Sequence, residues 1–272
     1  MITEIHQSSL NMALRCGEQF RRRYIDNDII PPGVAAGRGT GVHKANEINL
    51  KQKIVTQKDM SLEDLQDAAR DAYIQTFNNG VYVPKDMLSE KKKLINIGLN
   101  DTLRCTKVYI DNVAPIIKPI EIEKEFKLDV VGLELQLAGR MDYQEAPVVG
   151  DLKTTTMKWQ QDRIKNEIQV PFYSYVHRQE TGINPTFRYD VLIARRNKAN
   201  EPTSEEYQPL EYLCSETDYK ALFAKIKTFI NLLKAGVFPP SNPTNWWCGS
   251  DKWCGYYWTC PYMGFDSPKR WI

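Results

Sequence analysis

The sequence predicts an α/β protein: a central mixed β-sheet flanked by helices, with a helical N-terminal region and a cysteine-rich C-terminal tail. Three observations lead to this fold class. Up to about residue 113, apolar residues recur at helical spacing. Between about residues 114 and 215, several segments alternate apolar and polar residues, as half-buried strands do. One helical segment separates two of these strands, which is typical of a crossover within one sheet.

The composition is that of a folded protein. Of the 272 residues, 42% are apolar and 26% are charged, which excludes a disordered or low-complexity chain. Lys and Arg number 36 and Asp and Glu 34, so a nucleic acid would need a local basic patch rather than overall charge. Six cysteines are too few for a disulfide scaffold, and no segment approaches the length of a membrane span. We therefore expect an intracellular protein in a reducing compartment.

The N-terminal region begins with a helix capped by Ser8 or Ser9. Its apolar residues follow helical spacing, it carries Cys16, and it ends in the basic cluster 21–23. The turn 31–33, with the sequence Pro-Pro-Gly, interrupts the helical pattern.

A Gly-rich run then leads into a second helix, which bears His43 and Glu47. Ser61 and Asp64 have the spacing of a capping box, which predicts the start of a third helix. A longer helix is expected from about Met87 to Val113.

The middle of the chain alternates apolar and charged residues, most clearly in the sequence IEIEKEFKL. This pattern predicts a strand meander, then a crossover helix and two further strands. We expect strands at 116–128, 130–142, 147–153, 187–195 and 207–214, with helices at about 160–180 and 218–235.

Two carboxylates stand near the ends of consecutive expected strands, in the segments GRMD and GDLK. Asp142 ends the first segment, and Asp151 precedes Lys153 by two residues in the second. Because side chains alternate along a strand, Asp151 and Lys153 should point to the same side. Carboxylate oxygens suit hard divalent cations, and a nearby lysine can neutralise developing charge. The triplet alone would equally fit the polar face of a β-hairpin.

Other polar residues strengthen this interpretation. His43 and Glu47 lie one helical turn apart after the Gly-rich run. Gln169 and Tyr173 are also one turn apart, within the sequence QVPFY. Each pair alone would suit an ordinary helix surface, but the ordered combination with the two aspartates is specific.

The series GTGVH, GRMD, GDLK and QVPFY resembles the RecB-type branch of the PD-(D/E)XK nucleases. This branch includes the nuclease domains of RecB and AddB and the RecB-like exonucleases associated with CRISPR loci. The resemblance extends from Ser8 to Cys260. It implies a restriction-endonuclease-like core, one nuclease domain over residues 1–272, and a metal-dependent DNA exonuclease that acts on DNA ends or single strands in recombination, repair, or phage or CRISPR DNA processing.

The resemblance also implies roles for individual residues. Mg²⁺ or Mn²⁺ would be held by His43, Asp142, Asp151 and the carbonyl of Leu152, and Lys153 would be the catalytic lysine. Gln169 and Tyr173 match a motif that lies beside the active site and contacts DNA. Glu47 has no assigned role and is expected behind the metal ligands. The expected catalytic set is therefore Asp142, Asp151, Lys153, Gln169 and Tyr173.

Four cysteines near the two ends of the chain suit one metal centre. Cys16 stands near the start, and Cys248, Cys254 and Cys260 follow near the end. Four thiolates can hold an iron–sulfur cluster or a structural zinc ion, whereas free thiols in an apolar tail are the alternative. The resemblance implies a [4Fe–4S] cluster, although the first gap of the tail is longer here than in the family. Cys105 and Cys214 lie on apolar faces and are expected in the core.

Basic residues that precede or open the helix of QVPFY are candidates for phosphate contacts: Lys158, Arg163 and Lys165. DNA is the expected partner, with a homo-oligomer or recombination or CRISPR proteins as further partners and no membrane. We expect a cytoplasmic location, bacterial or, for a phage protein, in the host. The alternatives are a catalytically silent DNA-binding or scaffolding protein with the same fold, and a structural protein held by zinc.

Overall fold

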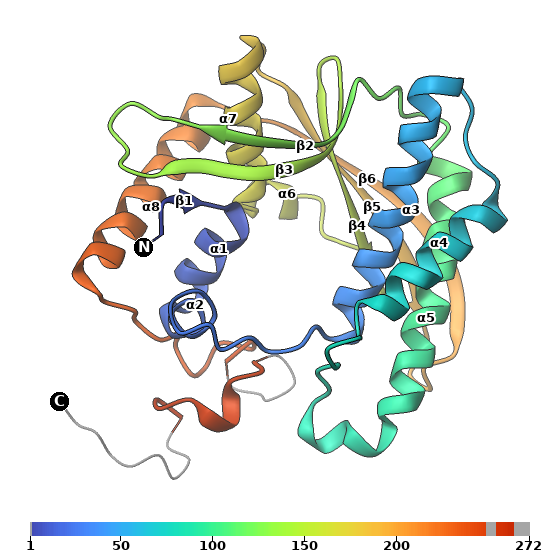
Figure 1. Cartoon of the computed structure of the whole chain (residues 1–272), viewed down its shortest axis with the longest axis horizontal. Coiled ribbons are helices and arrows are strands. Elements are labelled where there is room, and N and C mark those ends of the chain that lie inside the picture. Colours follow the sequence, from blue (N-terminus) through green and yellow to red (C-terminus); the bar gives the residue numbers. More distant parts are fainter. Residues whose placement is uncertain (1, 249–253, 264–272) are drawn as a thin grey trace.

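A computed structural model describes residues 2–248 and 254–263 of the chain. Within these ranges, six strands form one mixed sheet, with helices packed on both of its faces (Figure 1). The predicted fold class is therefore confirmed. No helix in the described part of the chain is both long enough and apolar enough to cross a membrane.

The larger elements follow one another in the order that the sequence predicts. The strands are β1 (Glu4–Ile5), β2 (Glu121–Leu128), β3 (Gln136–Glu145), β4 (Val148–Thr155), β5 (Thr186–Arg196) and β6 (Pro202–Leu213). The α-helices are α1 (Gln7–Arg15), α2 (Gly17–Phe20), α3 (Val34–Thr56), α4 (Leu62–Gln75), α5 (Lys91–Val108), α6 (Arg163–Asn166), α7 (Gln169–Thr181) and α8 (Glu216–Ala235).

The sheet has the order β1-β3-β4-β5-β6, and β2 pairs with β3 as well. Strands β2, β3 and β4 form an antiparallel meander, whereas β4 and β5 are parallel because α7 crosses between them. β5 and β6 close the sheet as an antiparallel pair. The parallel crossover places the start of α7 next to the middle of β4.

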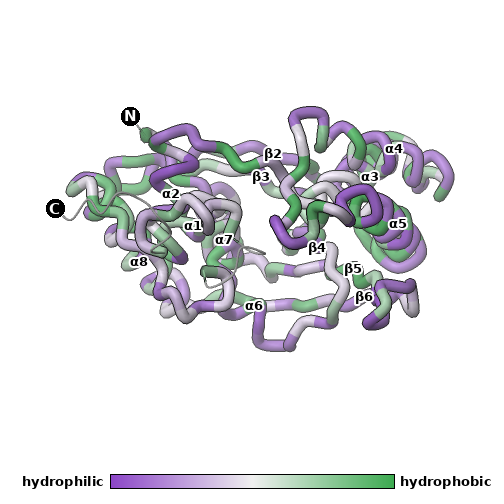
Figure 2. The backbone as a smooth tube through the Cα atoms, turned by 90° about the horizontal axis from the view of Figure 1, so that it is seen from below, coloured by the Kyte–Doolittle hydropathy of each residue, from purple (hydrophilic) through white to green (hydrophobic). Residues whose placement is uncertain are grey.

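Two apolar clusters cover the two faces of the sheet. One contains residues of α1, α7 and α8, including Phe172 and Ile226, and the other contains residues of α3, α4 and α5, including Leu50 and Cys105. Figure 2 shows these two groups of helices at opposite ends of the molecule, joined by the strands. The prediction that Cys105 and Cys214 are core residues is confirmed, since both are buried.

The first predicted helix differs from the structure in two respects, its capping residue and a break at Cys16. α1 is capped at His6, not at Ser8 or Ser9, and Cys16 has an extended backbone that separates α1 from α2. The cause is the close approach of a distant segment: the N–H of Gly17 donates to the carbonyl of Pro239 at 2.8 Å. A Cβ on Gly17 would lie 2.6 Å from the backbone of Phe238, so only glycine fits here.

Two further boundaries differ for reasons of proline chemistry. β2 begins at Glu121 rather than at residue 116, since Pro115 and Pro119 cannot donate to a strand ladder. The helix predicted at 160–180 is two helices, with Glu167 extended between them. Pro171 lies in the first turn of α7, where its missing N–H is not needed, so α7 begins anew at Gln169.

Candidate active site

Asp142 is held where β3 and β4 separate. The last residues paired between these strands are Tyr143 and Gly150. Beyond that pair, the backbone N–H of Leu152 donates to Oδ2 of Asp142 at 3.0 Å. Because a buried N–H needs an acceptor, the divergence of the two strands fixes the Asp142 carboxylate against β4.

His43 reaches the same carboxylate from α3. Its Nδ1 lies 3.1 Å from Oδ2 of Asp142. The Gly-rich run is part of α3 itself, and Gly41 brings this helix close to its neighbours: a Cβ there would lie 2.6 Å from the carbonyl of Ala69 on α4. Tight packing of α3 therefore positions His43 over the sheet.

Asp151 and Lys153 point to the same side of β4, as predicted from strand alternation. Lys153 Nζ lies 2.5 Å from Oδ2 of Asp151. The side-chain amide of Gln169 donates to the other carboxylate oxygen, and the Tyr189 hydroxyl donates to Oε1 of Gln169 at 3.2 Å. Gln169 thus fixes the orientation of Asp151 from the first residue of α7.

The charges of these groups depend on one another. Burial opposes a charge on His43, but the Asp142 carboxylate outweighs it and raises the pKa of His43 to about 9. For Asp142, burial acts upward, yet His43 holds its pKa below the ordinary value. Burial raises the pKa of Asp151 to about 6; Lys153 opposes this rise and the charge of Asp142 adds to it. The site therefore contains an ionised His43–Asp142 pair beside Asp151, a carboxyl group whose ionisation burial opposes.

The donor set fits a hard divalent cation, although the side chains point at one another. Among residues 2–248 and 254–263, no three His, Cys, Asp or Glu side chains form a ready-made metal site. His43 and Asp142 contact each other directly, and Asp151 turns to Lys153 and Gln169, as opposite charges do without an ion. Asp151 Oδ2 is buried, and its partner is the ammonium of Lys153, a charge that a divalent cation could replace.

Tyr173 lies beside this group, largely inside the core. It packs edge-on against Phe126 with ring centroids 5.8 Å apart. Gly139, of the GRMD segment, leaves room for both rings, since a Cβ there would lie 2.8 Å from Phe126 and 3.3 Å from Tyr173. Tyr173 is only 7% exposed, so most of its surface packs in the core beside the site.

The three basic residues predicted for phosphate contacts are all exposed. Arg163 stacks over the ring of Trp159 at 3.7 Å and pairs with Glu167 at 2.9 Å. Arg163 and Lys158 line one shallow hollow of about 360 Å³ directly after the end of β4, whereas Lys165 does not line it.

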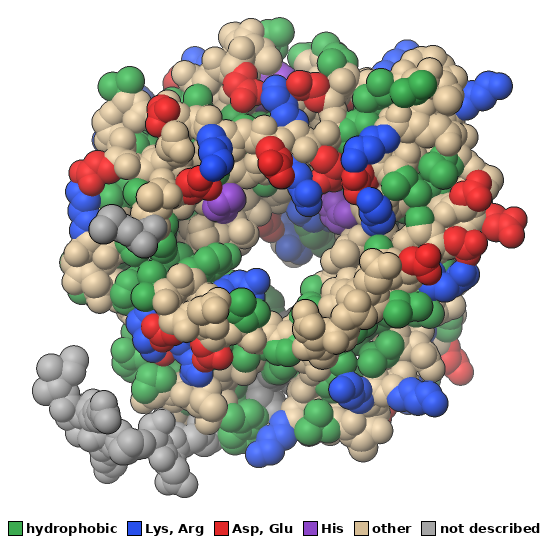
Figure 3. Space-filling model, viewed as in Figure 1, with side chains coloured by type: hydrophobic (Ala, Val, Ile, Leu, Met, Phe, Trp, Pro, Cys, Tyr) green, Lys and Arg blue, Asp and Glu red, His purple; other side chains and the backbone are tan. Residues whose placement is uncertain are grey.

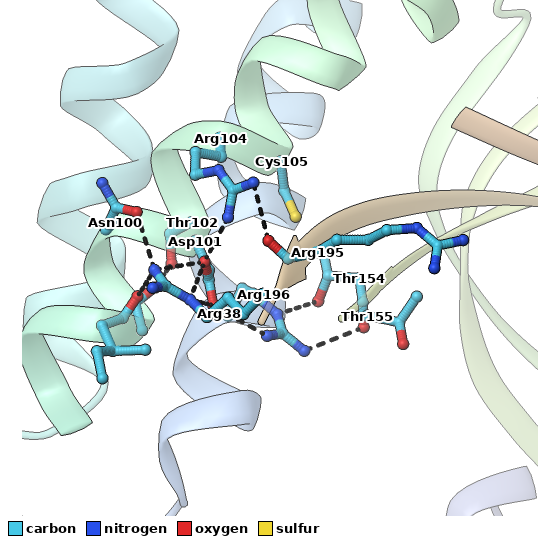
Figure 4. A network of polar contacts seen from close by, with 12 residues as sticks. Arg38, Asn100, Asp101, Thr102, Arg104, Cys105, Thr154, Thr155, Arg195 and Arg196 are labelled. Carbon is cyan, nitrogen blue, oxygen red and sulfur yellow. Dashed lines mark hydrogen bonds and ion pairs between the residues drawn. The ribbon is translucent and has the colours of Figure 1, made fainter. Parts of the chain in front are cut away.

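Arg38 makes polar contacts in this region whose partners the sequence did not predict. It donates from α3 to the hydroxyl and carbonyl of Thr154, directly after Lys153 on β4 (Figure 4). Asp101 of α5 lies 3.9 Å from Arg38 and pairs with Arg196 of β5 at 2.8 Å. This network joins α3 and α5 to the strands that carry the site. Its residues are far apart in the chain, so no local pattern predicts it.

All four predicted cysteine ligands line one enclosed cavity. Cys16 comes from the break between α1 and α2, and Cys248, Cys254 and Cys260 come from the tail. Two sulfurs accept hydrogen bonds: the Gln19 amide donates to Cys254 Sγ at 3.1 Å, and the N–H of residue 241 donates to Cys16 Sγ at 3.4 Å. Burial, together with the charges of the other thiolates, raises the pKa values of Cys248 and Cys260.

The C-terminal tail also contacts a segment that connects the α2 region to α3. This segment, residues 26–33, is here called the strap. The Tyr256 hydroxyl donates to the carbonyl of Asp28, and Gly255 packs so closely on Ile30 that a Cβ would lie 2.7 Å away. The N–H of Tyr82 donates to the carbonyl of Pro32 at 3.0 Å. Figure 3 shows an opening through the middle of the molecule, which Figure 1 places between α1 and α2, the strap, α3 and the strands.

The chain is similar to a known family and to solved structures. A family model described as the PD-(D/E)XK nuclease superfamily matches residues 5–261. The solved structure of a "Putative exonuclease" from Eubacterium rectale has a TM-score of 0.55 at 13% identity, covering 91% of this chain and 87% of that chain. The structure of SSO0001 has a TM-score of 0.41 at 14% identity, covering 97% and 88%. No curated protein matches the chain.

Proposed function

The chain belongs to the PD-(D/E)XK nuclease superfamily, and we propose that it is a Mg²⁺- or Mn²⁺-dependent DNA exonuclease of the RecB/AddB type. The observation that carries this proposal is the convergence of His43, Asp142 and Asp151 with Lys153 at the point where β3 and β4 separate. The E. rectale structure, with the same fold and a name that includes exonuclease, supports the activity class.

The chain supplies ligands and orientation at this site. His43, Asp142, Asp151 and the Leu152 carbonyl would hold the cation, which supplies a Lewis acid that polarises phosphate and lowers the pKa of water. Asp142 is preoriented by the Leu152 N–H, and Asp151 by Gln169.

Lys153 is the positive group beside the scissile phosphate. Its Nζ, at 2.5 Å from Asp151, can hold the attacking water or neutralise charge that develops on the phosphate oxygens. Lys158, Arg163 and Lys165 are proposed to contact the DNA backbone, with Gln169 and Tyr173 forming the wall next to it.

The opening through the molecule supports a single strand with a free end as the substrate. The strap closes one side of the opening and is held by contacts to the tail and to Tyr82. Because protein surrounds the opening, a DNA strand that passes through it to the carboxylates must enter by its end. A duplex is wider than a single strand and carries its bases paired inside.

We propose that the four cysteines hold a [4Fe–4S] cluster, with a zinc ion as the alternative. Their convergence on one enclosed cavity and the N–H donors to two sulfurs fit a thiolate centre. A bound cation would offset the burial, and the mutual repulsion of the thiolates, that raise the pKa values of Cys248 and Cys260.

The remaining proposals concern organisation. Residues 1–272 form one nuclease domain, with a helical part to about residue 113, a sheet core to about 215 and a C-terminal helix and tail. The protein acts in the cytoplasm, in recombination, repair, or phage or CRISPR DNA processing, as a homo-oligomer or with partner proteins of those pathways.

The test uses anaerobically purified full-length protein on end-labelled linear single- and double-stranded DNA, with Mg²⁺ or Mn²⁺ added. Circular single-stranded DNA of equal length is the matched substrate without ends. We expect degradation of the linear single strand, none of the circle, and none by Asp151→Asn, whose amide keeps the shape of the side chain. Binding of DNA by the wild type without cleavage under either cation would instead identify a catalytically silent DNA-binding protein.

A further inference from the structure

Tyr189 of β5 lies next to the site, on the face of the sheet that carries Asp151 and Lys153. It is paired with Asp151 in the parallel register of β4 and β5, and residues paired in this way point to the same face. Its side chain is fully buried, with an exposed fraction of 0%. Tyr189 can therefore influence the site through the side chains that it contacts.

The hydroxyl of Tyr189 determines which way the amide of Gln169 faces. A carboxylate accepts hydrogen bonds and donates none, so Gln169 must turn its Nε2 toward Asp151. Its Oε1 is also an acceptor, and it receives the Tyr189 hydroxyl at 3.2 Å. An amide turned the other way would bring its oxygen against the Asp151 carboxylate. Because a buried acceptor without a donor is costly, the hydroxyl stabilises the orientation in which Gln169 donates to Asp151.

The ring of Tyr189 lies beside the ammonium of Lys153. Lys153 Nζ is 5.3 Å from the ring centroid, within the range of a cation–π contact. In the described part of the chain, the ionic partner of this ammonium is Asp151. Asp151 is also a metal ligand in the proposed function, so a divalent cation would compete with Lys153 for it. The Tyr189 ring would then be the contact that keeps the ammonium in place.

Neighbouring aromatic side chains hold the Tyr189 ring. Phe187 packs edge-on against it with centroids 5.0 Å apart, and Trp159 does so at 5.6 Å. The main chain of Trp159 is held in turn by Gln208 of β6, whose amide accepts from the Trp159 N–H and donates to its carbonyl, both at 2.9 Å. A ring held from two sides keeps both its hydroxyl and its face at fixed positions.

We propose that Tyr189 is a positioning residue of the cleavage reaction, which orients the amide of Gln169 with its hydroxyl and the ammonium of Lys153 with its ring. Tyr189 has this role only if the proposed function holds, because both partners belong to the site described there. Through Gln169 it acts on Asp151 and on the cation that Asp151 would hold. Through its ring it acts on the positive charge beside the phosphate.

The first test is the Mn²⁺ affinity of full-length Tyr189→Phe in the absence of DNA, measured by electron paramagnetic resonance. This variant keeps the ring and loses the hydroxyl, so Mn²⁺ should bind about tenfold more weakly, as is typical when a group that orients a metal ligand is removed. Tyr207→Phe is the matched control, because Tyr207 donates its hydroxyl to the buried Asp190 at 2.7 Å. It should bind Mn²⁺ like the wild type. Wild-type affinity in Tyr189→Phe would overturn the proposal, whatever the stability of the variant.

A double-mutant cycle shows whether the hydroxyl acts through Gln169. Gln169→Met keeps the length of the side chain and removes its amide, so it should weaken Mn²⁺ binding by itself. In that background, Tyr189→Phe should cause no further weakening, because the group that transmits its effect is gone. A second loss of about tenfold in the double variant would contradict this role.

Tyr189→Leu tests the ring through the kinetics of cleavage. Compared with Tyr189→Phe, it also loses the aromatic face next to Lys153. We expect kcat at saturating DNA to fall by about a further tenfold, with KM and Mn²⁺ affinity as in Tyr189→Phe. Equal kcat values would exclude the ring from the role.

The first two tests require neither cleavage nor a folded Tyr189→Leu, so they decide the role of the hydroxyl by themselves. Failure of the proposed function has a different signature, namely a wild type that binds Mn²⁺ and does not cleave DNA. A wild type that does not bind Mn²⁺ would overturn both proposals.

Discussion

The carboxylate site and the cysteine cavity are built in opposite ways. Asp142, Asp151 and Lys153 stand on two consecutive strands, so neighbouring backbone fixes their positions. The cysteine cavity joins a break after α1 to the tail, through contacts such as Gln19 to Cys254, 235 positions apart. The first arrangement rests on neighbouring strands with support from α3 and α7, whereas the second joins the two ends of the chain. We therefore expect variants in the first region to change chemistry and variants in the second to change stability.

The largest effect is expected from Lys153→Met. Loss of the charge beside the phosphate should lower the cleavage rate by about 10²–10³-fold, while the protein stays folded because Asp151 can become protonated when its ionic partner is gone. Cleavage of end-labelled DNA and thermal unfolding measure the two quantities. Lys127→Met, which removes a surface lysine paired with Glu4, is the control. A rate close to that of the wild type would remove Lys153 from the chemistry.

Cys254→Ser is expected to change the stability of the protein rather than the chemistry of cleavage. Loss of a thiolate ligand should release the metal and cost about 4 kcal/mol or more, a fall of about 10 °C in melting temperature. Metal content is measured for iron and zinc separately, since zinc alone would indicate the single-ion centre. Cys214→Ser is the matched control, because Cys214 is buried but does not line the cavity. Undiminished metal in Cys254→Ser would refute the ligand assignment.

Two glycines of α3 allow a sharper comparison within one helix. A methyl group at Gly41 would lie 2.6 Å from the Ala69 carbonyl, so Gly41→Ala should cost about 1–3 kcal/mol and displace His43. Gly39 has no atom within 4 Å of such a methyl group, and Gly39→Ala should stabilise the helix by up to about 1 kcal/mol. Denaturant unfolding measures both, and equal effects would show that α3 does not depend on this contact.

The smallest effect is a pH dependence of the cation-free protein. His43 has a pKa of about 9, above its ordinary 6.5, so its ion pair stabilises the fold fully below pH 6.5. This contribution is lost as pH rises through about 9. Since the His43 side chain is 31% exposed, solvent screening keeps it small. Denaturant unfolding of the wild type and of His43→Gln at pH 6 and pH 9.5 measures this contribution. Between these pH values the free energy of unfolding should fall more for the wild type than for His43→Gln, and equal falls would contradict the prediction.

Local patterns predicted the strands of the carboxylate site well. Alternation placed Asp151 and Lys153 on one side of β4, and the spacing of Gln169 and Tyr173 put both on one helix, which begins at Gln169. Those features depend on a few neighbouring residues. The same periodicity did not predict the break at Cys16, because its cause is the backbone of Phe238 and Pro239, far along the chain.

Glu123 lies opposite Asp142 in the pairing of β2 with β3, and the sequence did not predict this position for a related reason. The charged alternation of IEIEKEFKL indicated a strand but did not indicate which of its glutamates faces Asp142. That assignment requires the register of β2 on β3 and the left-handed backbone at Glu123 itself. The partners of Arg38, Thr154 and Asp101, were not predicted because they lie on other elements.

The distance along the chain between the two halves of the cysteine cavity has a consequence for protein synthesis. Gln19 and Cys16 leave the ribosome long before Cys254, because 235 positions separate Gln19 from its partner. At about 5–20 residues per second, this interval lasts tens of seconds. During that time β3, β4 and α7 are already translated while the strap has no tail to hold it. The newborn chain therefore acquires its carboxylates first and its closed opening last.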